Sequence, residues 1–287
     1  MIKGNFSSNQ QSILSYASSK GFICGIDLRT KNVKNSWQLE NPAKFGLLEC
    51  YMVDPQRNWI ICGTDQGFYN LWDLRFQLLV RSWKDPRGTK INKLAYATHF
   101  GEEKIFSCVS EEEHASVTCW DIQNLECSQV LRANLKDNED PELERKSLFL
   151  NPPVVSQFEN SISEPLVEKN LKSQHSFRAL LTDRSNYLLT AGTDKTIRFW
   201  DLKDTKNSKI ISGPRKENKF PHYSLSKNNK EIEVWQENWM DEKEKINLTL
   251  NRNVDTHHND CIMDIKHLEG LNMLVTCSRD SIIKVWK

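Results

Sequence analysis

The sequence has almost no net charge and no long hydrophobic run. Its 39 basic and 38 acidic residues give a formal net charge of +1, so composition favours neither nucleic acid nor an anionic lipid surface as a partner. No apolar stretch is long enough to span a bilayer, and the opening residues MIKGNFSSNQQ contain no apolar signal core. We therefore expect no binding of nucleic acid and only peripheral contact with membranes.

The motifs of common enzymes are also missing. The chain has no P-loop, no G-x-G-x-x-G and no G-x-S-x-G. It therefore lacks the common motifs that bind phosphate groups or supply a serine nucleophile. One cluster has metal-ligand residue types, His257, His258, Cys261 and His267, but its spacing matches no common zinc motif. We expect no catalytic residue, no cofactor and no metal.

Paired cysteine motifs are a third absence. None of the eight cysteines forms a C-x-x-C pair, and most lie in apolar runs such as NWIICGT and KIFSCVS. Free cysteine is among the most often buried residues, so these positions predict free buried thiols in strands. Free thiols indicate a reducing compartment, and we expect a cytoplasmic protein.

What the chain does contain is a repeat. Five segments share two or three apolar residues, small residues, a polar turn, and alternating apolar residues that end near Trp-Asp. They are Ser12–Arg29, Trp59–Arg75, Ile105–Ile122, Tyr187–Leu202 and Met273–Lys287. Each pattern predicts a β-hairpin with a tight turn, so the fold class is all-β.

The spacing of the repeats indicates propeller blades. The aspartates that end four units, Asp27, Asp73, Asp121 and Asp201, are separated by 46, 48 and 80 residues. The first two intervals are close to the roughly 40–45 residues of a four-stranded blade, and an insertion lengthens the third. The sequence therefore predicts about five blades of a β-propeller.

We interpret residues 1–287 as one propeller with two insertions. The units lie near 1–40, 41–84, 85–132, 175–213 and 256–287, and segments 133–174 and 214–255 are polar insertions, partly disordered. The second insertion contains Ile232, Val234, Trp235, Trp239 and Met240, which is too apolar for a pure linker. It either packs back on the propeller or docks a partner.

The dipeptides Trp72-Asp73, Trp120-Asp121 and Trp200-Asp201 resemble those of the WD-repeat family. In that family a histidine before the blade, a hydroxyl on its second strand, a turn aspartate and the strand tryptophan form a hydrogen-bonded set. By this resemblance the last blade has a complete set, with a structural rather than a catalytic role: His258, Thr276, Asp280 and Trp286.

The other blades depart from this pattern. The blade that ends at Trp200 keeps Thr190 and Asp194 without a well-placed histidine. Gln66 occupies the aspartate position of the second blade, and Ile26 replaces tryptophan in the first.

The segment Trp72–Trp83, WDLRFQLLVRSW, has two interpretations. It is either a third strand, a loop and an outer strand with Arg75 on the rim, or a W-D-x-R form that resembles the box by which some WD-repeat proteins dock onto cullin-based ubiquitin ligases. Under the first interpretation, four rim residues are our candidates for partner binding: Arg75, Phe76, Gln77 and Trp83.

Longer stretches resemble one family more closely. ICGTDQGFYNLWDLRFQL, LLTAGTDKTIRFWDL and the closing HHNDCIMDIKHLEGLNMLVTCSRDSIIKVWK are similar to the C-terminal WD-repeat domain of the kinase-like regulatory subunit of the class III phosphatidylinositol 3-kinase complex. The resemblance covers the whole chain apart from the two insertions, and it includes the Val-Trp-Lys ending.

This resemblance implies a non-catalytic scaffold for vacuolar protein sorting and autophagy. Its partners would be the lipid kinase catalytic subunit, a Beclin-like subunit and a second coiled-coil subunit, at endosomal or autophagic membranes. The kinase-like domain of such subunits has no counterpart here, since no H-R-D or D-F-G motif is present. Two alternatives stay open: a Gβ-like module that binds a Gα subunit, and a substrate receptor of a cullin ubiquitin ligase.

The end of the chain adds one expectation. The closing SRDSIIKVWK provides a turn and a third strand but no fourth strand, and IKGNFSSNQQ is typical of the innermost strand of its own blade. The resembled domain closes with about seven blades, within the range known for propellers. We therefore expect an open arc, the C-terminal part of a seven-bladed ring, with two exposed edges that favour aggregation.

Overall fold

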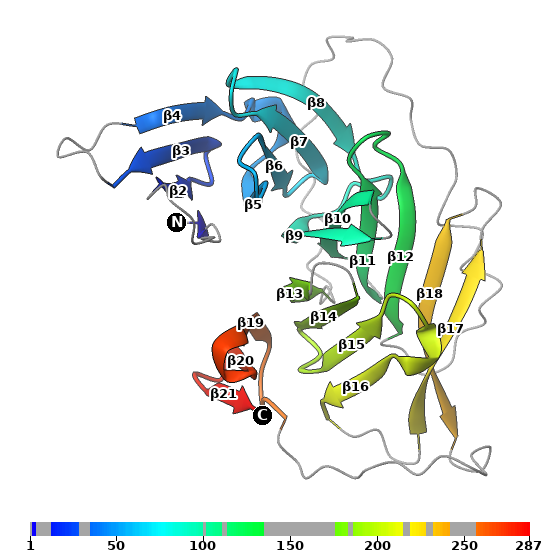
Figure 1. Cartoon of the computed structure of the whole chain (residues 1–287). Coiled ribbons are helices and arrows are strands. Elements are labelled where there is room, and N and C mark those ends of the chain that lie inside the picture. The colour runs from blue at the N-terminus through cyan, green and yellow to red at the C-terminus, as the bar shows by residue number, and fades with distance from the viewer. Residues whose placement is uncertain are drawn as a thin grey trace, which may run out of the picture.

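The described strands are arranged as an arc of five sheets, or blades, with the first strand of each blade toward a common centre (Figure 1). This computed structural model describes residues 2–3, 13–28, 35–99, 102–110, 114–134, 176–182, 186–214, 219–227, 232–241 and 257–287. Within these ranges no helix has the length and apolar character needed to cross a bilayer.

The strands follow the repeats of the sequence. Blade one has β1 (Ile2–Lys3), β2 (Ile13–Ala17), β3 (Phe22–Asp27) and β4 (Asn35–Glu40), and blade two has β5 (Leu48–Val53), β6 (Trp59–Thr64), β7 (Phe68–Asp73) and β8 (Leu78–Lys84). Blade three starts with β9 (Ile91–His99), β10 (Glu102–Ser110), β11 (His114–Asp121) and β12 (Cys127–Asn134). Blade four has β13 (Phe177–Thr182), β14 (Tyr187–Gly192), β15 (Ile197–Asp201) and β16 (Lys209–Ser212), and blade five has β19 (Ile262–Leu268), β20 (Met273–Ser278) and β21 (Ile283–Trp286). Short 3-10 turns lie at Ala43–Phe45 (η1), Thr205–Asn207 (η2) and Glu269–Leu271 (η4).

These findings confirm the prediction of an all-β propeller with five blades. Second strands such as β6 are buried on both faces, because each blade packs against neighbours on two sides. Ile60, Ile61 and Cys62 are therefore all fully buried although they follow one another in sequence. The eight cysteines are free thiols, six of them buried, as the sequence predicted.

The described part of the second insertion contains a β-hairpin. Strands β17 (Lys219–Lys227) and β18 (Glu233–Asp241), each of nine residues, form an antiparallel hairpin. Strand β18 adds in parallel to β12, from Gln129 opposite Glu233 to Ala133 opposite Glu237, so the sheet of blade three has six strands. Of the two interpretations of this insertion, packing back on the propeller is the one observed. Apart from its first two residues, the first insertion, 133–174, lies outside the described residues.

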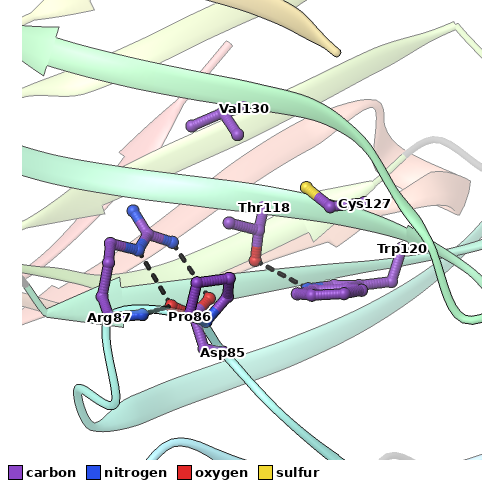
Figure 2. A pocket seen from close by; sticks show the side chains of 7 residues that line it. All are labelled: Asp85, Pro86, Arg87, Thr118, Trp120, Cys127 and Val130. Atoms are coloured by element: carbon purple, nitrogen blue, oxygen red, sulfur yellow. Dashed lines mark hydrogen bonds and ion pairs between the residues drawn. The ribbon is translucent and has the colours of Figure 1, made fainter. Parts of the chain in front are cut away.

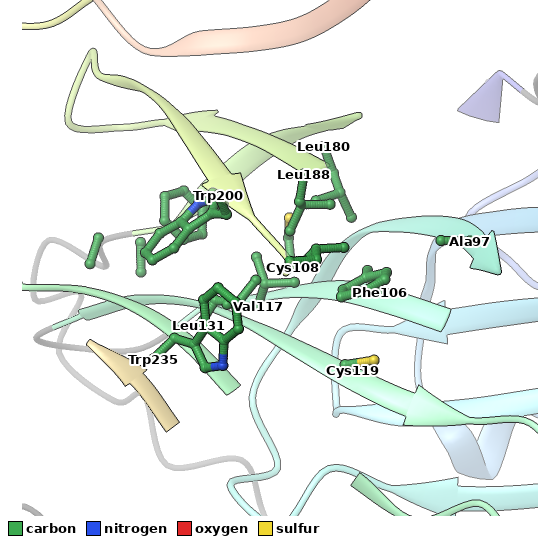
Figure 3. Packing of buried hydrophobic residues seen from close by; sticks show 14 of the residues in the cluster. Ala97, Phe106, Cys108, Val117, Cys119, Leu131, Leu180, Leu188, Trp200 and Trp235 are labelled. Atoms are coloured by element: carbon green, nitrogen blue, oxygen red, sulfur yellow. The ribbon is translucent and has the colours of Figure 1, made fainter. Parts of the chain in front are cut away.

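One apolar cluster joins blades three and four to this hairpin. Val117 and Leu131 of blade three pack toward Leu188 and Trp200 of blade four, and Trp235 of β18 lies beside Leu131 (Figure 3). All five side chains are at most 5% exposed. The hairpin is therefore part of the propeller core.

A buried ion pair fixes the hairpin to blade four. The guanidinium of Arg198 on β15 donates from Nε to Oε2 of Glu237 at 2.6 Å and from Nη2 to Oε1 at 3.0 Å. Both side chains are at most 1% exposed. Asp194 contacts the same guanidinium at 2.5 Å, and the hydroxyl of Tyr223 on β17 donates to Glu237 at 3.1 Å. Burial lowers the pKa of Arg198, but the charges of Asp194 and Glu237 outweigh it and raise the pKa above its usual value.

Removing the charge of Glu237 is expected to destabilise the fold strongly. The change Glu237→Gln leaves a buried guanidinium without its bidentate partner, which costs about 3 kcal/mol in the free energy of unfolding. Urea denaturation measures the loss. Glu233→Gln in the same strand is the matched control, because Glu233 is 28% exposed and pairs with an exposed Lys227. Equal stability of the two variants would contradict the role of Glu237 in fixing the hairpin to blade four.

Candidate functional site

The structure brings together the four residues of the expected set in blade five. His258 lies between the other groups, with Nδ1 at 3.1 Å from Oδ2 of Asp280 and Nε2 at 2.8 Å from Oγ1 of Thr276. The indole Nε1 of Trp286 donates to the same Thr276 oxygen at 2.9 Å. The set joins the start of the blade to its second and third strands. Every polar atom is used inside the blade, so the arrangement is structural.

Asp280 also holds the turn between β20 and β21. Its carboxylate accepts the backbone N–H of Asn259 at 2.8 Å and of Ile282 at 3.0 Å. Burial alone raises the pKa of Asp280, but these hydrogen bonds and the one with His258 hold the pKa well below its usual range. Ser281, the next residue, has a positive φ of 65°.

Blade four retains only part of this set. Trp200 Nε1 donates to Thr190 Oγ1 at 2.9 Å, as Trp286 does to Thr276. Asp194 lies in the turn and pairs with Arg198. In blade four the turn aspartate is thus paired with Arg198, whereas in blade five the turn aspartate is paired with His258.

Blades two and three hold their tryptophans differently. In blade three, Trp120 Nε1 donates to Thr118 at 3.0 Å, and Thr118 lies 2.6 Å from Ser107. The hydroxyl of Tyr69 reaches Ser107 at 2.7 Å from blade two, so this network crosses the blade interface. In blade two, Cys62 takes the place that Thr190 has on the second strand of blade four, and Trp72 Nε1 is buried without a hydrogen-bond partner among the described residues.

The aspartates of the three Trp-Asp dipeptides share one role. Each accepts, through Oδ1, the backbone N–H groups two and three residues ahead, and so closes the turn into the outer strand. The pairs are Asp73 with Arg75 and Phe76, Asp121 with Gln123 and Asn124, and Asp201 with Lys203 and Asp204. These residues therefore shape the rim of the propeller.

The rim candidates do not form one surface. Arg75 and Phe76 lie at the exposed β7–β8 turn, where the guanidinium pairs with Asp73 and lies 5.5 Å from the Phe76 ring. Gln77 has a positive φ of 54°, so it shapes the turn. Trp83 lies at the far end of β8 and stacks on Tyr69 at 5.2 Å. Only three of the four candidates are thus grouped, because strand β8 carries Trp83 away from the turn.

No signal in the sequence pointed to Arg198 or Tyr223, and only a weak one pointed to Glu237. The acidic and aromatic stretch EVWQENWMDEKEK contains Glu237, but nothing local distinguishes it from its exposed neighbours. Its role depends on a partner 39 residues away in sequence.

A small cavity and the buried thiols of the described residues offer little for chemistry. A cavity of about 20 Å³ lies between blades two and three, room for roughly one water (Figure 2). No three acidic, histidine or cysteine side chains within the described ranges are arranged to hold a metal. Burial raises the pKa of the Cys50 and Cys119 thiols to about 12, which suppresses the reactive thiolate.

The comparisons with known proteins match these features. The family described as WD domain, G-beta repeat, matches residues 172–201 and 249–287. The probable serine/threonine-protein kinase vps15 of Dictyostelium discoideum is 23% identical over 99% of this chain, and serine/threonine-protein kinase VPS15 of Arabidopsis thaliana is 27% identical over 92%. The VPS15 of Saccharomyces cerevisiae is 23% identical over 73%. The chain spans about a fifth or less of these relatives, 20%, 19% and 13% of their lengths.

A solved structure supports the fold alone. A chain of the crystal structure of the mitotic checkpoint complex superposes with a TM-score of 0.55 over 96% of this chain and 60% of its own length. Its sequence identity is 10%, so the likeness concerns architecture only.

Loss of the Thr276 hydroxyl, which contacts both His258 and Trp286 in blade five, is expected to destabilise the protein. Thr276→Val leaves the nitrogens of the buried His258 and the partly buried Trp286 without their partner, at a cost of about 1–3 kcal/mol. Thermal or urea denaturation measures it. Thr89→Val is the control, since the Thr89 hydroxyl is buried with no hydrogen bond among the described residues and its loss should be nearly neutral.

Asp280 is expected to make stability dependent on pH in the acid range. Its folded-state pKa is lower than the ordinary value of 3.8, so its contribution is present above about pH 4 and is lost as pH falls further. Denaturation of the wild type and Asp280→Asn between pH 5 and pH 2 tests this. The stability difference between them should shrink on acidification, and a difference independent of pH would contradict the assignment.

Proposed function

We propose that this chain, a VPS15-like WD-repeat domain, is a non-catalytic scaffold of a class III phosphatidylinositol 3-kinase complex that acts in endosomal or vacuolar sorting and autophagy. One observation carries the proposal: relatives named as VPS15 kinases align over nearly the whole chain, and this chain spans about a fifth of their length. The kinase activity in their names would then belong to regions that have no counterpart here.

The described geometry suits a scaffold. The titratable and hydroxyl groups that could do chemistry, such as His258, Thr276 and Ser107, are engaged in hydrogen bonds that hold blades together. A frame with such internal bonding presents its rim without a large ordering cost on binding. The expected partners are the lipid kinase catalytic subunit, a Beclin-like subunit and a second coiled-coil subunit. Through them the domain would be cytoplasmic and peripheral on endosomal or autophagic membranes.

The exposed turn of blade two is the part of the rim that we propose for partner contact. Phe76 is 69% exposed and the Arg75 side chain 61% exposed, and an arginine beside an aromatic ring is a common binding pair. Trp83 is set apart from this pair by its packing on Tyr69.

Alanine at Arg75 and Phe76 is expected to weaken coprecipitation of the Beclin-like subunit by about fivefold or more, since binding pairs of this kind often supply over 1 kcal/mol each. The matched control is alanine at Gln123 and Asn124, the corresponding turn of blade three. Quantitative mass spectrometry of the tagged chain measures both. Unchanged recovery would overturn the contact, and recovery of cullin adaptors or a Gα subunit without lipid kinase subunits would overturn the scaffold proposal itself.

A further inference from the structure

The outer edge of blade three already carries an added strand. Strand β18 runs parallel to β12, and Gln129 Nε2 donates to Glu233 Oε2 at 3.2 Å at the start of the pairing. Trp235 and Glu237 of β18 are buried between blades three and four. The propeller frame therefore accepts an extended acidic and apolar segment at the outer edge of a blade.

Blade two has the same edge without the added strand. Trp72 lies opposite Leu79 in blade two, as Trp120 lies opposite Cys127 in blade three, and each outer strand has a bulge at the next residue. By this register Arg81 corresponds to Gln129. Strand β8 is the last of its sheet, and no described strand pairs with its outer edge.

The side chains beside this edge are unusually apolar. Phe76, Leu78 and Val80 are 69%, 63% and 54% exposed. By the same register the corresponding residues of blade three are polar: Asn124, Glu126 and Ser128. An open strand edge is usually protected by charge or by a covering segment, and an exposed apolar row next to it marks an interaction site.

A cavity lies at the matching place between blades two and three. Thr118 and Trp120, which line it, correspond to Arg198 and Trp200 of blade four. Those blade-four residues contact the hairpin through Glu237 and Tyr223. Figure 2 shows the cavity beside the Asp85–Arg87 pair, directly after β8. The groove that the hairpin fills at one blade interface is thus left partly open at the preceding one.

We propose that Phe76–Lys84, with this cavity, binds an extended segment of a partner protein as an added strand parallel to β8. We call this surface the β8 groove. The segment carries an acidic residue opposite Arg81, which has no ion-pair partner among the described residues, followed by apolar residues over Ser82 and Trp83. Strand β8 contains Arg81 and Lys84 and no acid, so a basic segment is disfavoured. The inference deepens the proposed function by naming the kind of segment that the rim takes, and it rests on that function only for the partner's identity.

The probe is a fluorescent peptide that copies Ile232–Asp241 with glutamine in place of Glu237. In blade three Glu237 lies opposite Ala133, and by the same register Asp85 takes the place of Ala133 in blade two. The glutamine therefore avoids repulsion between the peptide and Asp85. Fluorescence anisotropy with the full chain measures binding. Arg81→Glu should weaken binding by about tenfold, and a peptide with lysine in place of Glu233 should recover it on that variant. Lys209→Glu, on the exposed edge of blade four, is the matched control and should leave binding unchanged.

Two N-methylated peptides test strand addition. One is methylated at the odd-numbered and the other at the even-numbered backbone nitrogens, so that only one loses its hydrogen bonds to the edge. We expect one to bind and the other not. Equal binding of both, or no effect of Arg81→Glu, would overturn the β8 groove. Sedimentation of the chain with and without Leu78→Asp distinguishes a second occupant, because a dimer lost on this change would assign the edge to another copy. All of these readouts use this chain and the peptides without other subunits. The β8 groove can therefore fail while the scaffold proposal stands, and the scaffold proposal can fail while the β8 groove stands.

Discussion

The buried pair of Arg198 and Glu237 is the interaction on which the blade three and four region depends. A charge removed from water is stable only with an opposite charge and matched hydrogen bonds, and here the bidentate contact, Asp194 and Tyr223 supply them. The pair also explains why blade four departs from the family pattern. Its turn aspartate balances an arginine, and a segment outside the repeat completes the site.

The tryptophans of the blades also depend on buried hydrogen-bond partners. A buried tryptophan N–H needs an acceptor. Thr276 provides it in blade five, Thr190 in blade four and Thr118 in blade three. Among the described residues, the network of blade three extends to a neighbouring blade through Tyr69. The described blades are therefore held by local networks, by hydrogen bonds between blades such as that from Arg178 to Asn92, and by the hairpin.

Much of this could be predicted because the signals are local. The alternation of apolar residues located the hairpins, and the repeat spacing gave the blades. The blade-five residues could be named from the family resemblance, and the structure places them within hydrogen-bond distance. The β17–β18 extension could not be predicted, because a parallel pairing with β12 has no turn signal in the sequence. The separation of Trp83 from Arg75 was missed for another reason. The six positions from Gln77 at the turn to Trp83 span about 20 Å along an extended strand, although these residues look adjacent in the sequence.

The parallel strand β18 has a consequence for how the protein is made. Gln129 and Glu233 are neighbours in the sheet but lie 104 residues apart in the chain. At about 5–20 residues per second, a ribosome needs roughly 5–20 s to synthesise the stretch between them. During that time strand β18 is not yet available to the outer edge of blade three, and Arg198 is synthesised before its carboxylate partner Glu237. Blades three and four therefore reach their final form together, after both have been synthesised, and the order of assembly differs from the order of translation.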